Sequence, residues 1–205
     1  MFGSPKYRQE SRIRKEAPVA VDFLNERTRV SMRMSDEAFG YLPEITSEER
    51  ETEQERFRTL LGRWQQKGEH EVEVHIEAIV EFEPRELRYL DERHGEVVVD
   101  TREIKNLVTN LQATYPEYRQ YMLLGELHTH PVLQNELDSH QRSWHFSSGD
   151  QEAWINEYKN GVLSNDCPFI FGGAGAMENG KTGYSFYRVV REGKEYSVIH
   201  VPWPA

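Results

Sequence analysis

The stretch YMLLGELHTHP (121–131) carries the strongest prediction about the fold, because an apolar run ends in two histidines and a proline. His128 and His130 are two residues apart, and such residues lie on the same face of a strand. Two imidazoles that project together from a strand end can bind one zinc ion. The alternative is two ordinary polar side chains, which is how a lone histidine at a strand end would be interpreted. The paired spacing favours a metal site.

A catalytic zinc ion is typically bound by three protein side chains and keeps one position open for water. Asp150 is the best candidate for the third ligand, because SSGD (147–150) lies where a loop enters a predicted helix. If Ser147 is the N-cap of that helix, the pattern S-x-x-D also predicts an ordinary capping box without a metal. The two interpretations are compatible, because a capped helix start holds a ligand rigidly. Other candidates between the motifs are Glu136, Asp138, His140 and His145.

Length and composition predict a single soluble domain with a sizeable core. The chain has 205 residues, of which 37% are hydrophobic and 29% are charged. Its net charge of -10 argues against sequence-independent binding to nucleic acid, which needs a basic surface. A single cysteine, Cys167, excludes a disulfide within the chain and favours a reducing compartment. With no signal peptide or membrane span expected, we predict a cytoplasmic protein that binds neither nucleic acid nor membranes.

Hydrophobic periodicity predicts an α/β fold around one sheet. Residues 1–26 are charged and lack periodicity, which indicates a tail or an arm that docks on a domain at 27–205. Predicted strands cover 28–34, 57–64, 72–82, 96–100, 119–128, 167–175, 184–190 and 195–201. Predicted helices begin at Ser35 and cover 47–57, 101–116 and 147–161.

The motifs together resemble those of the JAMM metalloproteases, also called the MPN+ or JAB domain family. Sequences of this family carry H-x-H-P followed by S-x-x-D, which are HTHP (128–131) and SSGD (147–150) in this chain. The family also has a glutamate at the start of an upstream strand, and ERFRTLLG (55–62) places Glu55 at the matching position. The order of predicted elements over residues 28–201 is similar to that of the family as well.

The resemblance implies a single MPN/JAB-like domain in which helices flank a mixed, twisted β-sheet, similar to the cytidine-deaminase-like arrangement. It implies that His128, His130 and Asp150 bind one catalytic zinc ion. Glu55 would act as the general base toward water and then pass the proton to the leaving amine. Ser147 would donate a hydrogen bond to the oxyanion that forms during the reaction.

The resemblance also implies a function. Family members are zinc-dependent isopeptidases or peptidases that remove or process ubiquitin-like proteins, as deubiquitinases do. A compact chain such as this one is similar to stand-alone bacterial members, which act beside E1-like and E2-like proteins, including in antiphage operons. The expected partners are therefore a ubiquitin-like protein, its conjugates and proteins of the same conjugation system.

Three features depart from the family pattern or add to it. The gap between the motifs holds 15 residues (132–146), which is longer than is typical and indicates an insertion. This insertion is either a surface loop or a flap that contacts the substrate. Glu55 lies in the charged run ERETEQER (49–56), so residues 57–64 could instead continue a helix. Glu126 shares a predicted strand face with His128 and could approach the metal, and we expect it either at the rim of the site or behind the metal ligands.

Two other classes of function stay open at this point. Many proteins with the MPN fold lack the metal and act only as scaffold or binding modules. A cupin-like metal barrel is a further alternative, because HTH followed by Glu136 loosely resembles the cupin ligand set. Cupins consist almost entirely of strands, however, and this sequence predicts at least two helices.

Overall fold

The computed structural model describes residues 21–52, 57–82, 89–93, 96–129, 148–176 and 182–202. In these ranges the elements are β1 (Arg29–Met34), α1 (Asp36–Thr52), β2 (Phe57–Gly68), β3 (Glu71–Val80), β4 (Tyr89–Arg93), β5 (Glu96–Val99), α2 (Thr101–Thr114), the 3-10 helix η1 (Pro116–Tyr118), β6 (Met122–Thr129), α3 (Ser148–Lys159), β7 (Ile170–Ala176), β8 (Thr182–Glu192) and β9 (Glu195–His200).

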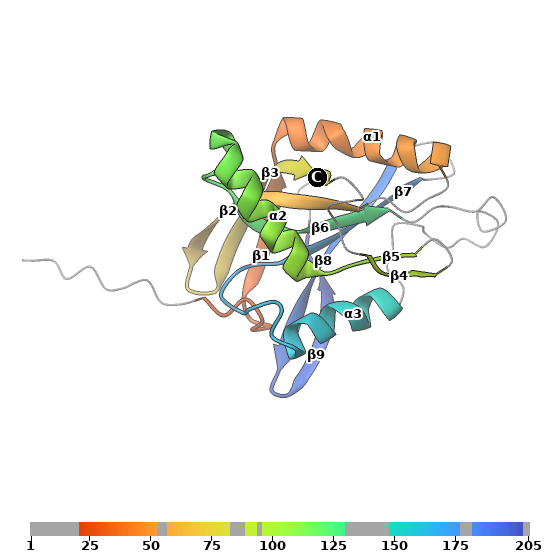
Figure 1. Cartoon of the computed structure of the whole chain (residues 1–205). Coiled ribbons are helices and arrows are strands. Elements are labelled where there is room, and N and C mark those ends of the chain that lie inside the picture. Colours follow the sequence, from red (N-terminus) through yellow and green to blue (C-terminus); the bar gives the residue numbers. More distant parts are fainter. Residues whose placement is uncertain are drawn as a thin grey trace, which may run out of the picture.

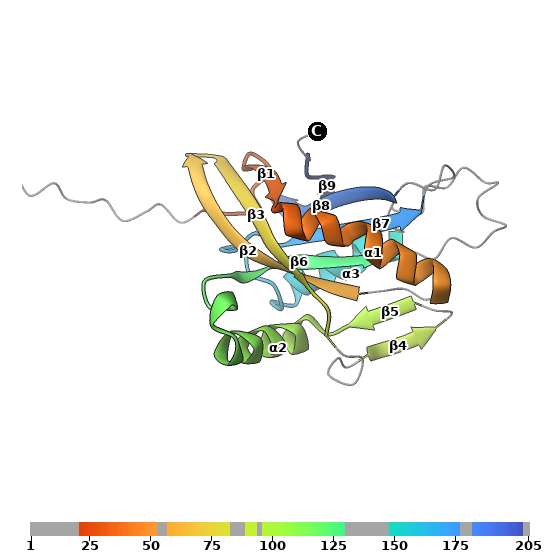
Figure 2. The same cartoon turned by 90° about the horizontal axis from the view of Figure 1, so that it is seen from above.

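Seven of these strands form one curled sheet in the order β1-β3-β2-β6-β7-β8-β9, and β4 pairs with β5 as a separate hairpin (Figures 1 and 2). The pairs β1–β3 and β6–β7 are parallel, and the other neighbours are antiparallel. The predicted α/β class is therefore confirmed. The three α-helices also exclude an all-strand barrel of the cupin type.

Most predicted elements occur close to their expected bounds, with three informative differences. Residues 57–64 form the first part of β2, so they do not continue the preceding helix. The helices expected from Ser35 and over 47–57 form one helix, α1, which continues through Pro43 to Thr52. Strand β4 lies in the charged connection for which no strand was predicted.

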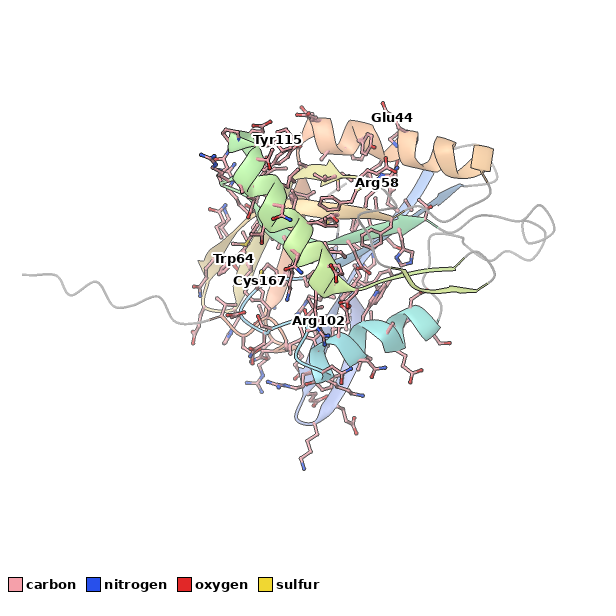
Figure 3. All side chains as sticks on the ribbon, in the orientation of Figure 1. Glu44, Arg58, Trp64, Arg102, Tyr115 and Cys167 are labelled. Atoms are coloured by element: carbon pink, nitrogen blue, oxygen red, sulfur yellow. The ribbon has the colours of Figure 1, made fainter. Side chains whose placement is uncertain are left out.

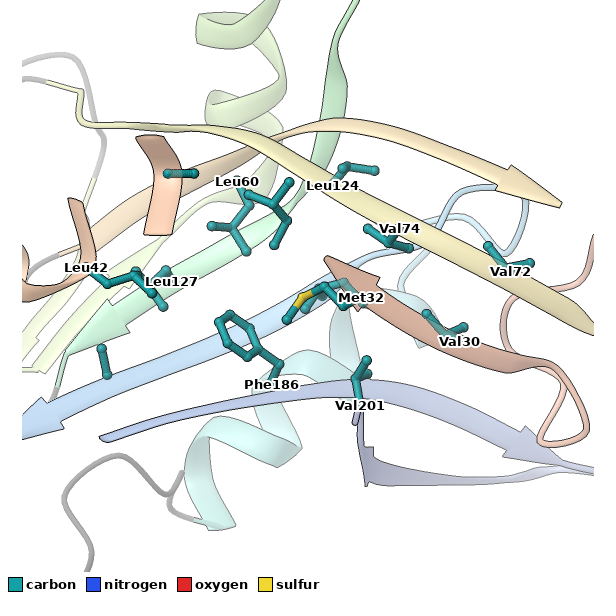
Figure 4. Packing of buried hydrophobic residues seen from close by; sticks show 14 of the residues in the cluster. Val30, Met32, Leu42, Leu60, Val72, Val74, Leu124, Leu127, Phe186 and Val201 are labelled. Atoms are coloured by element: carbon teal, nitrogen blue, oxygen red, sulfur yellow. The ribbon is translucent and has the colours of Figure 1, made fainter. Parts of the chain in front are cut away.

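One face of the large sheet packs against α1 and forms the main apolar core (Figure 4). Ala38 and Leu42 of α1 contribute to this core. Pro43 cannot donate a backbone hydrogen bond inside the helix, but the burial of this apolar face against the sheet favours a continuous α1. The strands contribute Val30, Met32, Leu60, Val72, Val74, Ile76, Leu124, Leu127, Ile170, Ala174 and Phe186.

The other face of the sheet is covered by α2 and α3, so the domain has three layers (Figure 1). Ile104 and Val108 of α2 pack near Leu61 of β2. On α3, Trp154 and Tyr158 are buried in a second cluster together with Phe169, Phe171 and Val189. Since α3 begins at Ser148, this layer also places Asp150 over the sheet.

The segment before β1 packs onto the domain. Phe23 and Leu24 are 3% and 4% exposed, and each belongs to a different apolar cluster. The buried guanidinium of Arg188 on β8 donates hydrogen bonds to the carbonyl oxygens of Phe23 and Thr28. These contacts attach residues 23–28 to the β8 end of the sheet.

Strand β6 contains a β-bulge that sets the direction of its side chains. Leu60 pairs with Gly125 and Leu61 pairs with Leu123, so Leu124 is the extra residue. Leu124 and Leu127 therefore both lie in the main core although they are three residues apart. At Gly125 a Cβ atom would lie 1.9 Å from the carbonyl oxygen of Ile170 on β7, so this position requires glycine.

None of the helices in the part of the chain that the structure describes combines the length and apolar character needed to cross a membrane.

Candidate functional site

The structure brings together two residues of the two sequence motifs. His128 lies near the end of β6, and Asp150 lies in the first turn of α3. The Nε2 atom of His128 is 3.9 Å from the Oδ1 atom of Asp150. Their side chains are 14% and 26% exposed, so both are mostly shielded but reachable from solvent. A strand end and a helix start that are 22 residues apart in the sequence therefore meet at one place.

The distance between these two atoms distinguishes a hydrogen bond from two ligands of one metal ion. A hydrogen bond between a charged imidazole and a carboxylate is about 2.7–2.9 Å long, so 3.9 Å is too long for one. Two donors on one tetrahedral zinc ion lie roughly 3.3 Å apart, because each bond is about 2.0–2.1 Å long. Small side-chain adjustments would bring His128 and Asp150 to that spacing. An imidazole nitrogen and a carboxylate oxygen are zinc donors, so these two residues fit this metal.

The remaining predicted site residues, Glu55, His130 and Ser147, lie outside the described residues, as does the insertion at 132–146. Across the described ranges, no group of three or more His, Cys, Asp or Glu side chains is placed to hold a metal. The register does pair Phe57, which follows Glu55 by two residues in the sequence, with His128.

Trp154 lies beside the His128–Asp150 pair. It follows Asp150 by one turn of α3 and is 4% exposed. Its ring stacks on that of Phe171 on β7, with centroids 4.2 Å apart and planes at 20°. The centroid of the His128 ring is 6.5 Å from that of Trp154. Aromatic packing thus fixes the part of α3 that follows the candidate ligand Asp150.

Glu126 lies on the same face of β6 as His128, since the two residues pair with Thr59 and Phe57 of β2, which are also two residues apart. The sequence predicted a position either at the rim or behind the metal ligands, and the side chain is buried with 9% exposure, which excludes the rim. The Nε1–H group of Trp154 donates a hydrogen bond of 3.2 Å to its Oε1 atom. A buried carboxyl therefore connects the strand that carries His128 with the helix that carries Asp150.

Burial controls the charge of this carboxyl. Burial first, and then the nearby carboxylates of Glu157 and Asp150, raise the pKa of Glu126 from 4.5 to about 8, while the hydrogen bond from Trp154 opposes this increase. Burial also raises the pKa of Glu157, while the Thr101 hydroxyl and Lys105 oppose that increase. Two carboxyl groups that contact α3 or belong to it therefore have raised pKa values.

Sequence reasoning missed Trp154 and Glu157. Spacing could have indicated Trp154, because a residue four positions after Asp150 lies on the same side of a helix. Glu157 gave no comparable signal: its partner, the hydroxyl of Thr101, comes from α2, 56 residues away. Only the tertiary structure brings Glu157 and Thr101 together.

Arg58 of β2 lies on the opposite face of the sheet. It pairs with Leu127 in the β2–β6 register, is 1% exposed, and its Nη1 atom lies 3.0 Å from Oε1 of Glu81 (Figure 3). Because a carboxylate offsets its charge, Arg58 can be buried beside the main core. It is thus separated by the sheet from His128 and Glu126.

Comparisons with known proteins do not assign a family. No protein-family model matches this chain, and no curated protein matches it. Among solved structures, the chain is similar to the solution structure of protein DSY2949 from Desulfitobacterium hafniense. The TM-score is 0.48 with 15% sequence identity, over 84% of this chain and 92% of the other. A similarity of this size carries no argument about function, which must come from the site itself.

Proposed function

We propose that this protein is a zinc-dependent isopeptidase or peptidase of the JAMM type that removes or processes a ubiquitin-like protein. The observation that carries the proposal is the approach of His128 and Asp150 to 3.9 Å. These residues belong to two separate motifs, H-x-H-P and S-x-x-D, whose combination resembles that of the JAMM family. The two motifs are 22 residues apart at these positions, and the fold brings them together at the end of a central strand.

In this proposal His128, His130 and Asp150 hold the metal. Zinc, when bound, supplies a Lewis acid that lowers the pKa of water to about 7 and polarises a carbonyl group. Three protein ligands would leave one position for a reacting group, as catalytic zinc sites require. The partial exposure of His128 and Asp150 would allow a substrate chain to reach this position.

Two further residues would take part in hydrolysis, one by transferring a proton and the other by stabilising negative charge. Glu55 would accept a proton from the attacking water and deliver it to the leaving amine as the C–N bond breaks. The pairing of Phe57 with His128 supports this role, since Glu55 precedes Phe57 by two residues. The Ser147 hydroxyl would donate a hydrogen bond to the carbonyl oxygen of the scissile bond as it gains negative charge.

A panel of ubiquitin-like fusion proteins, including E1-like and E2-like conjugates, tests the reaction. The wild-type protein should cleave at least one member in the presence of zinc. Glu55→Gln should keep stoichiometric zinc but lose at least about 100-fold in cleavage rate, because general base catalysis contributes about 10²–10⁴-fold. Glu53→Gln is the matched control in the same charged run, and it should cleave at the wild-type rate.

The outcomes separate the parts of the proposal. Full activity of Glu55→Gln, or equal loss in Glu53→Gln, would contradict the assignment of the base. A wild-type protein that binds zinc but cleaves no member of the panel would contradict the substrate class. A wild-type protein that binds no zinc would exclude a metallopeptidase and favour the scaffold alternative.

A further inference from the structure

Two side-chain hydrogen bonds attach α3 to the rest of the domain. Trp154 donates to Glu126 on β6, and Glu157 accepts from the hydroxyl of Thr101 at the start of α2. The two attachments differ in their distance from the candidate ligand. Trp154 lies one helical turn after Asp150, whereas Glu157 lies two turns after it.

The attachment at Trp154 is placed to control the geometry of the metal ligands. Its acceptor, Glu126, precedes His128 by two residues and shares its strand face. Its donor, Trp154, follows Asp150 by four residues and shares its side of α3. The hydrogen bond therefore joins the two elements that carry the ligands, directly beside the ligands.

This attachment is also rigid. Trp154 is 4% exposed and stacked on Phe171, and Glu126 is 9% exposed. A buried indole N–H group and a buried carboxyl oxygen both lose free energy if they are left without a partner. Helix α3 cannot slide along β6 or rotate on it without breaking this bond and the stacking of the two rings.

We propose that Glu126 and Trp154 are positioning residues that hold His128 and Asp150 at the separation required for zinc binding. This inference rests on the proposed function, because it assigns a role toward the metal of that site. The Glu126–Trp154 bond sets the height and rotation of the first turns of α3 over the end of β6. The Glu157–Thr101 bond attaches the later part of the helix to α2 and has no such role.

Four variants of the full chain test the proposal. Glu126→Leu removes the acceptor, and Trp154→Phe removes the donor but keeps an aromatic ring against Phe171. Glu126→Gln keeps a carbonyl oxygen that can accept the same hydrogen bond, so it is the conservative rescue. Thr101→Val is the matched control, because it removes the hydrogen bond at the other attachment of the same helix.

Three measurements are made on each protein after removal of metal: zinc affinity by competition with a chromophoric chelator, the visible absorption spectrum of the Co²⁺ form, and thermal stability without metal. Glu126→Leu and Trp154→Phe should weaken zinc binding by about 10–100-fold, the usual effect of disturbing groups that orient ligands. Their Co²⁺ spectra should differ from that of wild type. Glu126→Gln and Thr101→Val should keep wild-type affinity and spectrum, even where stability changes.

The results can fail in distinguishable ways. If wild type binds zinc and both Glu126→Leu and Trp154→Phe retain its affinity and spectrum, the positioning role is wrong and the proposed function stands. If Thr101→Val weakens zinc binding as much as Trp154→Phe does, any loss of attachment of α3 weakens zinc binding. The specific positioning role of the Glu126–Trp154 bond is then wrong. If wild type binds no zinc, the proposed function itself fails. If Glu126→Leu does not fold, Trp154→Phe gives the same test.

Discussion

The two faces of β6 differ in composition although one strand provides both. On the face toward α1, Leu124, Leu127 and Thr129 are all 0% exposed. On the face toward α3, Glu126 and His128 replace the apolar residues that a central, covered strand normally has. Burial of these polar groups costs free energy of folding, which the first face offsets by apolar packing. The contrast teaches that one face of β6 stabilises the fold while the other carries the polar groups of the proposed metal site.

Leu127 and His128 are adjacent on β6 but point to opposite faces of the sheet. Substitutions at these two positions should have the largest effects. His128→Ala should weaken zinc binding by at least about 100-fold, because loss of a ligand exceeds the effect of disturbing a group that orients one. The unfolding free energy of the metal-free protein should change little, since His128 contributes no large apolar surface to the core. Chelator competition and denaturant unfolding measure the two quantities. Zinc affinity equal to wild type would place the metal elsewhere.

Leu127→Ala should have the reverse pattern. The substitution leaves a cavity in the core under α1 and should lower the unfolding free energy by about 2–5 kcal/mol. Zinc affinity, measured at a temperature where the variant is folded, should stay within about threefold of wild type. A large loss of affinity in folded Leu127→Ala would show that the two faces are not independent.

Gly125→Ala should lower the unfolding free energy by a smaller amount than Leu127→Ala. Gly125 lies in the bulge that sets the direction of the side chains on both faces of β6. The new Cβ atom would lie 1.9 Å from the Ile170 carbonyl oxygen, so β6 and β7 must separate locally. We expect a loss of about 1–3 kcal/mol in unfolding free energy, comparable to other local backbone strain. Denaturant unfolding of the metal-free protein would measure it, and a variant as stable as wild type would contradict the close approach.

The last prediction concerns pH and the polar face alone. Folding raises the pKa of Glu126 from 4.5 to about 8, so between these values the folded state holds a proton that the unfolded state has lost. The stabilisation is complete below pH 4.5 and is lost as the pH rises through about 8. Glu126→Gln cannot titrate, so the metal-free variant should gain stability over wild type between pH 5 and pH 9. Parallel stability curves for the two proteins, from unfolding at pH 5, 7 and 9, would contradict the burial of a neutral carboxyl.

Local patterns in the sequence predicted much of this arrangement. The apolar run before His128 predicted β6, and the polar residues before Asp150 predicted the start of α3, because strand periodicity and helix capping are local properties. The glycine at position 193 was also predicted in the turn between β8 and β9, where its φ is 61°. The meeting of His128 and Asp150 was expected from the family resemblance.

Other features depend on residues that are distant in the sequence. The bulge at Leu124 arises from the register with β2, and no local pattern predicts which residue is extra. The burial of Glu126 and its bond to Trp154 depend on where α3 lies on the sheet. The continuity of α1 through Pro43 depends on packing against strands that are far away in the chain. These features require the tertiary structure because non-local contacts decide them.

Crystals of the zinc-loaded protein, measured at wavelengths on both sides of the zinc absorption edge, test the central claim most directly. We predict one anomalous peak that lies about 2.0–2.2 Å from Nε2 of His128 and from a carboxylate oxygen of Asp150, with His130 as the third ligand. An anomalous map with no peak between His128 and Asp150, from protein with stoichiometric zinc in the crystal, would contradict the account.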